Sequence, residues 1–110
     1  MELNSLSKVQ IESNSSNYLV AKVSDGNGGV KIVVRAKPLN DADILAGLQK
    51  EADGLKVECL GGGLLRGTNE NGVHICDCSP RYGQEPNREL TLMLFQAARP
   101  DVTFTVGTPS

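Results

Sequence analysis

The residue types best suited to ligand binding concentrate between Glu58 and Gly83. In order, this stretch contains glycines at 61–63, a polar turn at Gly67–Gly72, an alternating run at 73–78 and a Ser/Gly loop at 79–83. We expect a strand that stops at the glycines, followed by a hairpin whose second strand leads into the loop. Such a frame suits a small anionic ligand, because glycine-rich turns and serine offer N–H and O–H donors.

Metal binding and nucleotide binding are weaker interpretations of the same stretch. On an extended strand, His74, Cys76 and Cys78 would all face one side. Neighbours on that side lie about 6.6–7 Å apart, which fits tetrahedral zinc poorly, and Cys59 would have to supply a fourth ligand. We therefore predict a packing face, no metal and no cofactor. Glycines 61–63 lack the Lys-Ser/Thr of a nucleotide loop, so close backbone approach or a strand bulge is the simpler explanation.

Composition predicts one folded domain over residues 1–110. The chain is 39% hydrophobic and 22% charged, with a net charge of −2. This charge provides no general attraction to nucleic acid or to an anionic membrane, and the scarcity of aromatic residues disfavours base stacking. We therefore expect no nucleic-acid partner and no membrane partner.

Cellular location is inferred from what the sequence lacks. No apolar run approaches the roughly 20 residues that a membrane helix needs. The first residues have no signal-peptide pattern, and the three cysteines have no framework spacing. These features predict a cytoplasmic protein, which we expect to be a monomer.

Apolar periodicity predicts an α/β (α+β) fold, a mixed sheet of about six strands sandwiched by two helices. Asn40 is a good helix cap and Gly54 a helix stop, and a second helix is expected at 88–98. Strands are expected at 9–12, 18–23, 30–36, 56–60, 64–66, 73–78 and 101–106.

One set of motifs carries a family resemblance: Glu58–Gly63 (ECLGGG), Val73–Ile75 (VHI), Ser79 and Tyr82-Gly83. These residues resemble the janus family, to which the small phosphohistidine phosphatases belong. Weaker matches extend the resemblance over most of the chain, at 9–12, 18–23, Arg35, 42–44 and 99–101. The resemblance implies a single janus domain of α/β sandwich type that removes phosphate from phosphohistidine.

The position of the family's catalytic histidine, immediately before an Ala-Asp-Ile run, is Asp41 in this chain. The resemblance places this residue beside the bound phosphate at a helix start. Two unit charges about 4 Å apart at an effective dielectric near 20 repel by roughly 4 kcal/mol. Three outcomes are open: Asp41 is protonated when phosphate binds, a cation screens it, or the site no longer takes phosphate.

The resemblance also implies a set of phosphate-binding positions, occupied here by Asn17, Arg35, Ala42, Ser79 and Arg81. Asn17 stands where the family has a lysine, so one positive charge is lost. Ala42 and Arg81 would bind through backbone N–H groups, and the Arg81 side chain either grips the phosphate or is a solvated loop residue. His74 matches a strand histidine of the family, and we assign it a structural role in preference to a direct one.

Two functions are consistent with these residues. The first is a catalytically impaired member that binds phosphate or a phosphohistidine-containing protein, which Asp41 and Asn17 favour. The second is an active phosphohistidine phosphatase with altered catalytic groups, which Arg35, Ser79 and Arg81 favour. An aspartate can act as phosphoryl acceptor or general base, but both roles need a metal or several cations nearby.

Overall fold

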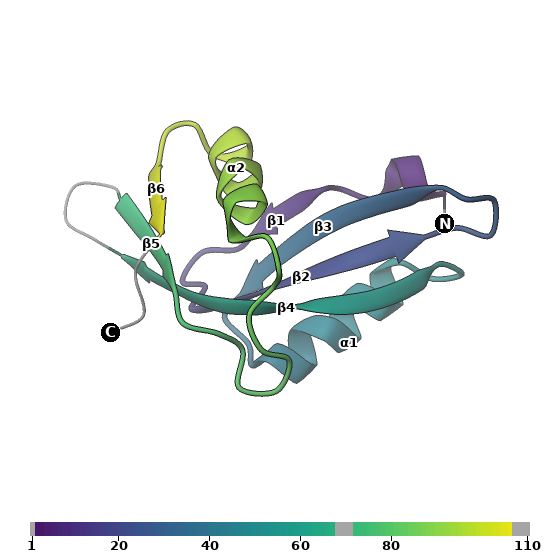
Figure 1. Cartoon of the computed structure of the whole chain (residues 1–110), viewed down its shortest axis with the longest axis horizontal. Coiled ribbons are helices and arrows are strands. Elements are labelled where there is room, and N and C mark those ends of the chain that lie inside the picture. Colours follow the sequence, from purple (N-terminus) through teal and green to yellow (C-terminus); the bar gives the residue numbers. More distant parts are fainter. Residues whose placement is uncertain (1, 68–71, 107–110) are drawn as a thin grey trace.

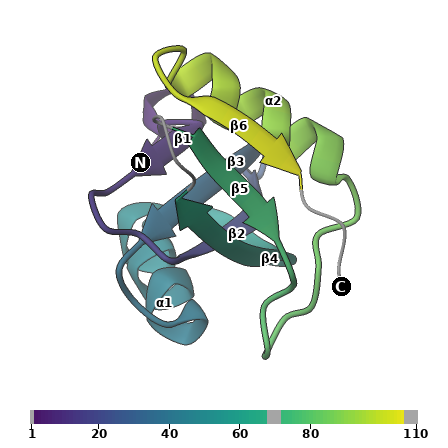
Figure 2. The same ribbon diagram turned by 90° about the vertical axis from the view of Figure 1, so that its left-hand side faces the viewer.

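The protein folds into a six-stranded mixed sheet with one helix on each face (Figures 1 and 2). The structure is a computed structural model that describes residues 2–67 and 72–106. The strands are β1 (Val9–Ile11), β2 (Asn17–Ser24), β3 (Val30–Lys37), β4 (Lys56–Gly67), β5 (Gly72–Cys76) and β6 (Thr103–Val106). The helices are η1 (Leu3–Ser5, a 3-10 turn), α1 (Asp41–Glu51) and α2 (Arg88–Ala98). The predicted fold class is therefore confirmed. No helix of the described part is long and apolar enough to cross a membrane.

The strand order across the sheet is β1-β3-β2-β4-β5-β6. Strands β2, β3, β4 and β5 pair antiparallel, whereas the two edge strands β1 and β6 pair in parallel with their neighbours. A hydrophobic layer forms on each face, because residues alternate between the faces along a strand. The layer under α2 includes Tyr18, Val34 and Phe95, and the layer under α1 includes Val23, Val33 and Leu48.

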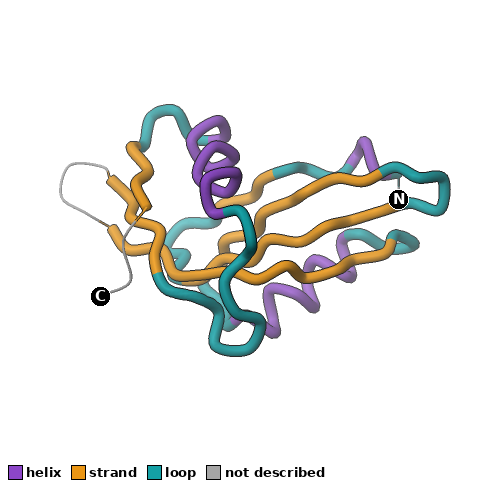
Figure 3. Tube along the Cα trace, viewed as in Figure 1, coloured by secondary structure: helices purple, strands orange, loops and turns teal. Residues whose placement is uncertain are grey.

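The predicted interruption of the sheet at glycines 61–63 is wrong. Strand β4 runs through them without a break, which merges the expected strands 56–60 and 64–66 (Figure 3). The interpretation of these glycines as close approach and bulge is confirmed. A Cβ on Gly62 would lie 2.0 Å from the backbone oxygen of Tyr18, and the register with β2 shifts beside Gly61, whose φ is +132°. The glycines let β2 and β4 pair closely, so they extend the sheet rather than end it.

Both helices begin after an asparagine cap, as predicted for Asn40. The side-chain oxygen of Asn40 accepts the N–H of Asp43, and that of Asn87 accepts the N–H of Leu90. Gly54 lies just past the end of α1 with a φ of +85°, as a helix stop requires. Strand β5 ends earlier than predicted, at Cys76, because Asp77 adopts a φ of +58°. The predicted polar turn at Gly67–Gly72 lies largely outside the described residues, since 68–71 are not among them.

Candidate functional site

The site lies where the first turn of α1 meets the loop after β5. Asp41 is the first residue of α1, and only 13% of its side chain is exposed. Asn40 caps the helix with its own side chain, so the carboxylate of Asp41 is free to turn toward Ser79. Residues 38 positions apart in the chain are thereby brought into contact.

Three donors converge on this carboxylate, and we call them the anion cradle: the Ser79 hydroxyl and the backbone N–H groups of Arg81 and Ala42. Ser79 Oγ donates to Oδ2 of Asp41 at 2.5 Å, and the N–H of Arg81 donates to the same oxygen at 3.1 Å. The N–H of Ala42 donates to Oδ1 at 2.8 Å. The carboxylate of Asp41 therefore occupies the donors that the resemblance assigned to a phosphate.

The Arg81 side chain adds a weaker electrostatic contact. Its Nε lies 3.9 Å from Oδ1 of Asp41, and 65% of the side chain is exposed. Solvent screens such a pair, so the guanidinium contributes little to the fold. It does place an exposed positive charge beside the cradle.

The glycine motif of β4 holds the cradle loop in place. The N–H of Ser79 donates to the carbonyl of Gly62, and the N–H of Gly62 donates to the carbonyl of Gly83. Within the loop, Gly83 N–H donates to the Ser79 carbonyl, and Tyr82 N–H donates to Ser79 Oγ at 3.1 Å. The serine hydroxyl is thus oriented by one accepted bond and one donated bond.

A buried polar cluster lies behind the glycine motif, and we did not predict it. Arg88 Nη2 donates to the Gly62 carbonyl at 3.2 Å and to Oε1 of Glu85 at 2.8 Å. Oε2 of Glu85 accepts the hydroxyls of Tyr18 and Thr91. The spacing of Glu85 and Arg88 is ordinary for the start of a helix, so the sequence carries no sign of their burial.

The hydrogen bonds of the cradle lower the pKa of Asp41 below its ordinary value. The Ser79 hydroxyl is the largest cause, partial burial of the carboxyl opposes it, and the two backbone N–H groups and the Arg81 charge add to the lowering. The carboxylate is therefore ionised at neutral pH and weakly basic. Protonation of Asp41, one of the three outcomes left open, is the least favoured by these contacts.

Stability is expected to depend on pH through Asp41. A lowered pKa in the folded state stabilises the fold above the ordinary value of 3.8, and this contribution disappears as pH falls through the lowered pKa. Asp41→Asn should therefore be destabilising at pH 7 relative to wild type, with a difference that shrinks below pH 4. Urea unfolding at several pH values measures this difference, and Ser79→Ala, which removes the main cause, should flatten the wild-type pH profile. A wild-type to Asp41→Asn difference that is constant from pH 7 to pH 3 would contradict this account.

Of the other predicted phosphate-binding residues, Asn17 lies close to the cradle and Arg35 does not. A cavity of about 80 Å³ beside Asp41 is lined by Asn17, and the amide of Asn17 donates to the Leu39 carbonyl. Arg35 is fully buried and forms two hydrogen bonds with Glu51, the last residue of α1. Because α1 rises about 1.5 Å per residue, Arg35 is anchored roughly 15 Å along the helix from Asp41. The structure therefore does not bring Arg35 into the cradle.

The alternating face of β5 is used in two ways. His74 Nδ1 lies 2.8 Å from the Thr105 hydroxyl on β6, away from the cradle. Cys76 is buried, whereas Cys78 lies beyond the strand end and is exposed. Over residues 2–67 and 72–106, no three His, Cys, Asp or Glu side chains are grouped as metal ligands would be.

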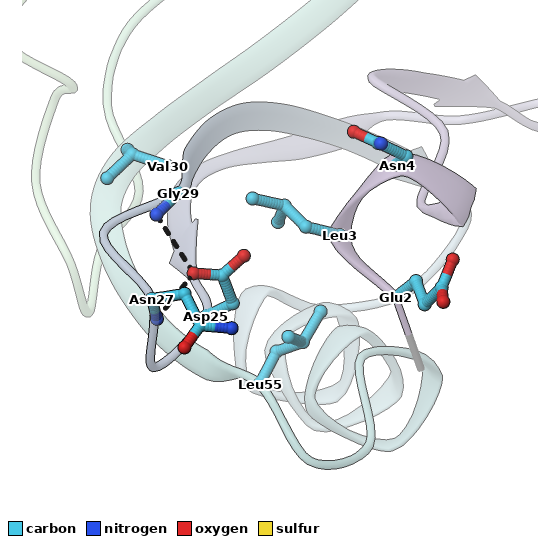
Figure 4. A pocket seen from close by; sticks show the side chains of 8 residues that line it. All are labelled: Glu2, Leu3, Asn4, Asp25, Asn27, Gly29, Val30 and Leu55. Atoms are coloured by element: carbon cyan, nitrogen blue, oxygen red, sulfur yellow. Dashed lines mark hydrogen bonds between the residues drawn. The ribbon is translucent and has the colours of Figure 1, made fainter.

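A larger cavity, of about 590 Å³, lies near η1 and the β2–β3 turn (Figure 4). Its polar lining includes Glu2, Asn4 and Asp25. One carboxylate oxygen of Asp25 accepts the N–H groups of Asn27 and Gly29, which closes the turn. Two carboxylates at its surface make this cavity unsuitable for an anion.

Comparison with known proteins agrees with the motifs around the cradle. Residues 3–102 match the model of the Janus/Ocnus family (Ocnus). No curated protein matches the chain. Since the match spans nearly the whole sequence, and includes the glycine motif, Asp41 and the Ser79 loop, this chain belongs to the Janus/Ocnus family.

Proposed function

We propose that this chain is a catalytically impaired, phosphohistidine-phosphatase-like member of the family that binds a phosphoprotein or phosphate rather than cleaving it. The observation that carries the proposal is the carboxylate of Asp41, which accepts hydrogen bonds from all three donors of the cradle. In this state the cradle holds the chain's own anion. A phosphate enters only when it displaces that carboxylate.

Hydrolysis receives little support from the same contacts. A general base works best with a pKa near the working pH, whereas the pKa of Asp41 is below its ordinary value. A phosphoryl acceptor needs strong positive charge around the reacting phosphate. The cation that contacts Asp41 among the described residues is Arg81, which is mostly exposed. The active phosphatase with altered catalytic groups is therefore the less favoured function.

Retention of an anion site is supported by the construction of the cradle. The Ser79 hydroxyl and the N–H of Arg81 meet at one oxygen of Asp41, and the N–H of Ala42 meets the other. Donors arranged around a carboxylate also suit the oxygens of a phosphate, particularly at a helix N-terminus. The loop that presents them is fixed to Gly62 by backbone bonds. Removal of the internal carboxylate should consequently leave a competent anion site.

Asp41→Ala is expected to raise the affinity for inorganic phosphate by about 10- to 100-fold, because it removes like-charge repulsion and frees the three donors. Asp41→His should do the same and also hydrolyse a phosphohistidine peptide, whereas the wild type should not. Amide chemical shifts of Ala42 and Arg81 during a phosphate titration report binding, and phosphate release reports turnover.

Asp43→Ala is the matched control, since it removes an exposed carboxylate from the same helical turn without touching the cradle. It should behave as wild type in both assays. Turnover by the wild type would overturn the proposed loss of catalysis. Failure of all variants to bind phosphate would show that the cradle is not an anion site.

A further inference from the structure

The first five residues of strand β4, 56–60, have an open edge. Strand β2 pairs with β4 along Lys56–Leu64, but β5 joins the other side only from Leu64 to Gly67. Within residues 2–67 and 72–106, no strand pairs with the side of 56–60 that faces away from β2. This part of β4 is the lower strand at the right of Figure 3. A row of backbone donors and acceptors is therefore available along this edge.

The register identifies which residues present these groups. The N–H of Val34 donates to the carbonyl of Lys8, just before β1. The backbone N–H and C=O groups of even-numbered residues of β3 therefore point away from β2. Odd-numbered residues of β2 therefore bond to β3, and even-numbered ones, such as Lys22, bond to β4. Glu58 pairs with Lys22, so its backbone N–H and C=O groups point toward β2. The N–H and C=O groups of Val57 and Cys59 consequently point outward.

The side chains of this edge are complementary to themselves. Lys56 and Glu58 are exposed, carry opposite charges and lie on one face of the strand. Val57 is half-buried on the other face, where it packs with the hydrophobic layer under α1. If two copies align antiparallel with Val57 opposite Val57, then Lys56 of each copy lies opposite Glu58 of the other. Those positions are the closer type of cross-strand pair.

We propose that β4 pairs with β4 of a second copy of this chain, in a two-fold symmetric dimer centred on Val57. The N–H and C=O of Val57 in each copy exchange hydrogen bonds, and two Lys56–Glu58 pairs fix the register. Helix α1 packs against β2, β3 and β4, so the two α1 helices lie side by side on one face of the joined sheet. No group of the anion cradle takes part, so the dimer does not depend on the proposed function. This proposal differs from the monomer that we expected from the sequence.

Sedimentation equilibrium of the full chain under reducing conditions tests the dimer by charge reversal. Lys56→Glu and Glu58→Lys should each raise the dimer dissociation constant at least tenfold, because like charges then face each other twice. Mixing the two variants should restore association as a heterodimer, in which every pair is again opposite in charge. The wild-type amides of Val57 and Cys59 should also exchange hydrogen more slowly as concentration rises.

Lys8→Glu is the matched control, because it makes the same charge change next to β1 at the opposite edge of the sheet. It should dimerise as wild type. A wild type that stays monomeric at several hundred micromolar would overturn the proposal, and would leave this edge for a strand of another protein. A dimer that tolerates both reversals, with no heterodimer preference, would overturn the β4 register.

Discussion

Gly62→Ala is expected to destabilise the protein by at least roughly 3 kcal/mol, a large share of the stability of a domain of this size. The added Cβ would lie 2.0 Å from the backbone oxygen of Tyr18 and 3.0 Å from its carbonyl carbon. Both atoms belong to the neighbouring strand, so the clash is relieved only if β2 and β4 move apart. Urea unfolding followed by circular dichroism measures the loss.

Gly47→Ala provides the control for the same substitution. Gly47 lies inside α1, and apart from the backbone of its own helix its added Cβ would meet no atom within 4 Å. Alanine there should stabilise the protein by about 0.5–1 kcal/mol through its better helix propensity. Opposite signs for the two glycines are therefore expected. Equal effects would contradict the close approach of β2 and β4.

Glu85→Ala is expected to destabilise the protein by about 3–5 kcal/mol, the cost of leaving a buried charge without its partner. The side chain of Glu85 is 1% exposed and that of Arg88 is 10% exposed. Nε of Arg88 is buried without a hydrogen-bond partner among the described residues, so this guanidinium already depends on its Glu85 contact. The hydroxyls of Tyr18 and Thr91 would lose their acceptor as well.

Asp101→Ala removes the carboxylate from an exposed arginine pair and serves as the control. The side chains of Arg99 and Asp101 are 48% and 64% exposed. Water replaces the lost contact, so the free energy of unfolding should change little. A comparable loss in Glu85→Ala and Asp101→Ala, measured by urea unfolding, would contradict the burial of the Glu85–Arg88 pair.

The buried cluster also keeps Tyr18 in its protonated form. Burial of the phenol is the largest cause that raises the pKa of Tyr18, and the neighbouring Glu85 carboxylate raises this pKa further. The hydroxyl therefore remains a donor to Glu85 throughout the physiological range. Because Arg88 donates to the carbonyl of Gly62, which also accepts the N–H of Ser79, this cluster supports the cradle loop from behind.

Local pattern determined most of the secondary structure of this protein. The asparagine caps, the apolar periodicity of α2 and the alternation of β1, β2 and β3 depend on neighbours within a few residues, so they can be read directly from the sequence. The motifs also singled out Asp41, Ala42, Ser79 and Arg81, which the fold does bring together. Their predicted phosphate binding stays a prediction.

Contacts between distant segments decided the rest. The sequence offers glycines 61–63 equally to a strand end or to close strand pairing, and only the position of Tyr18 on β2 selects pairing. Arg35 is bonded to Glu51, so it is anchored at the far end of α1 from the site to which it was assigned. The carboxylate of Asp41 was expected to repel a bound phosphate. In the folded chain this carboxylate itself accepts the hydrogen bonds of the cradle. The sequence shows that Asp41 and Ser79 are present, but only the tertiary structure brings these residues, 38 positions apart, into a hydrogen bond.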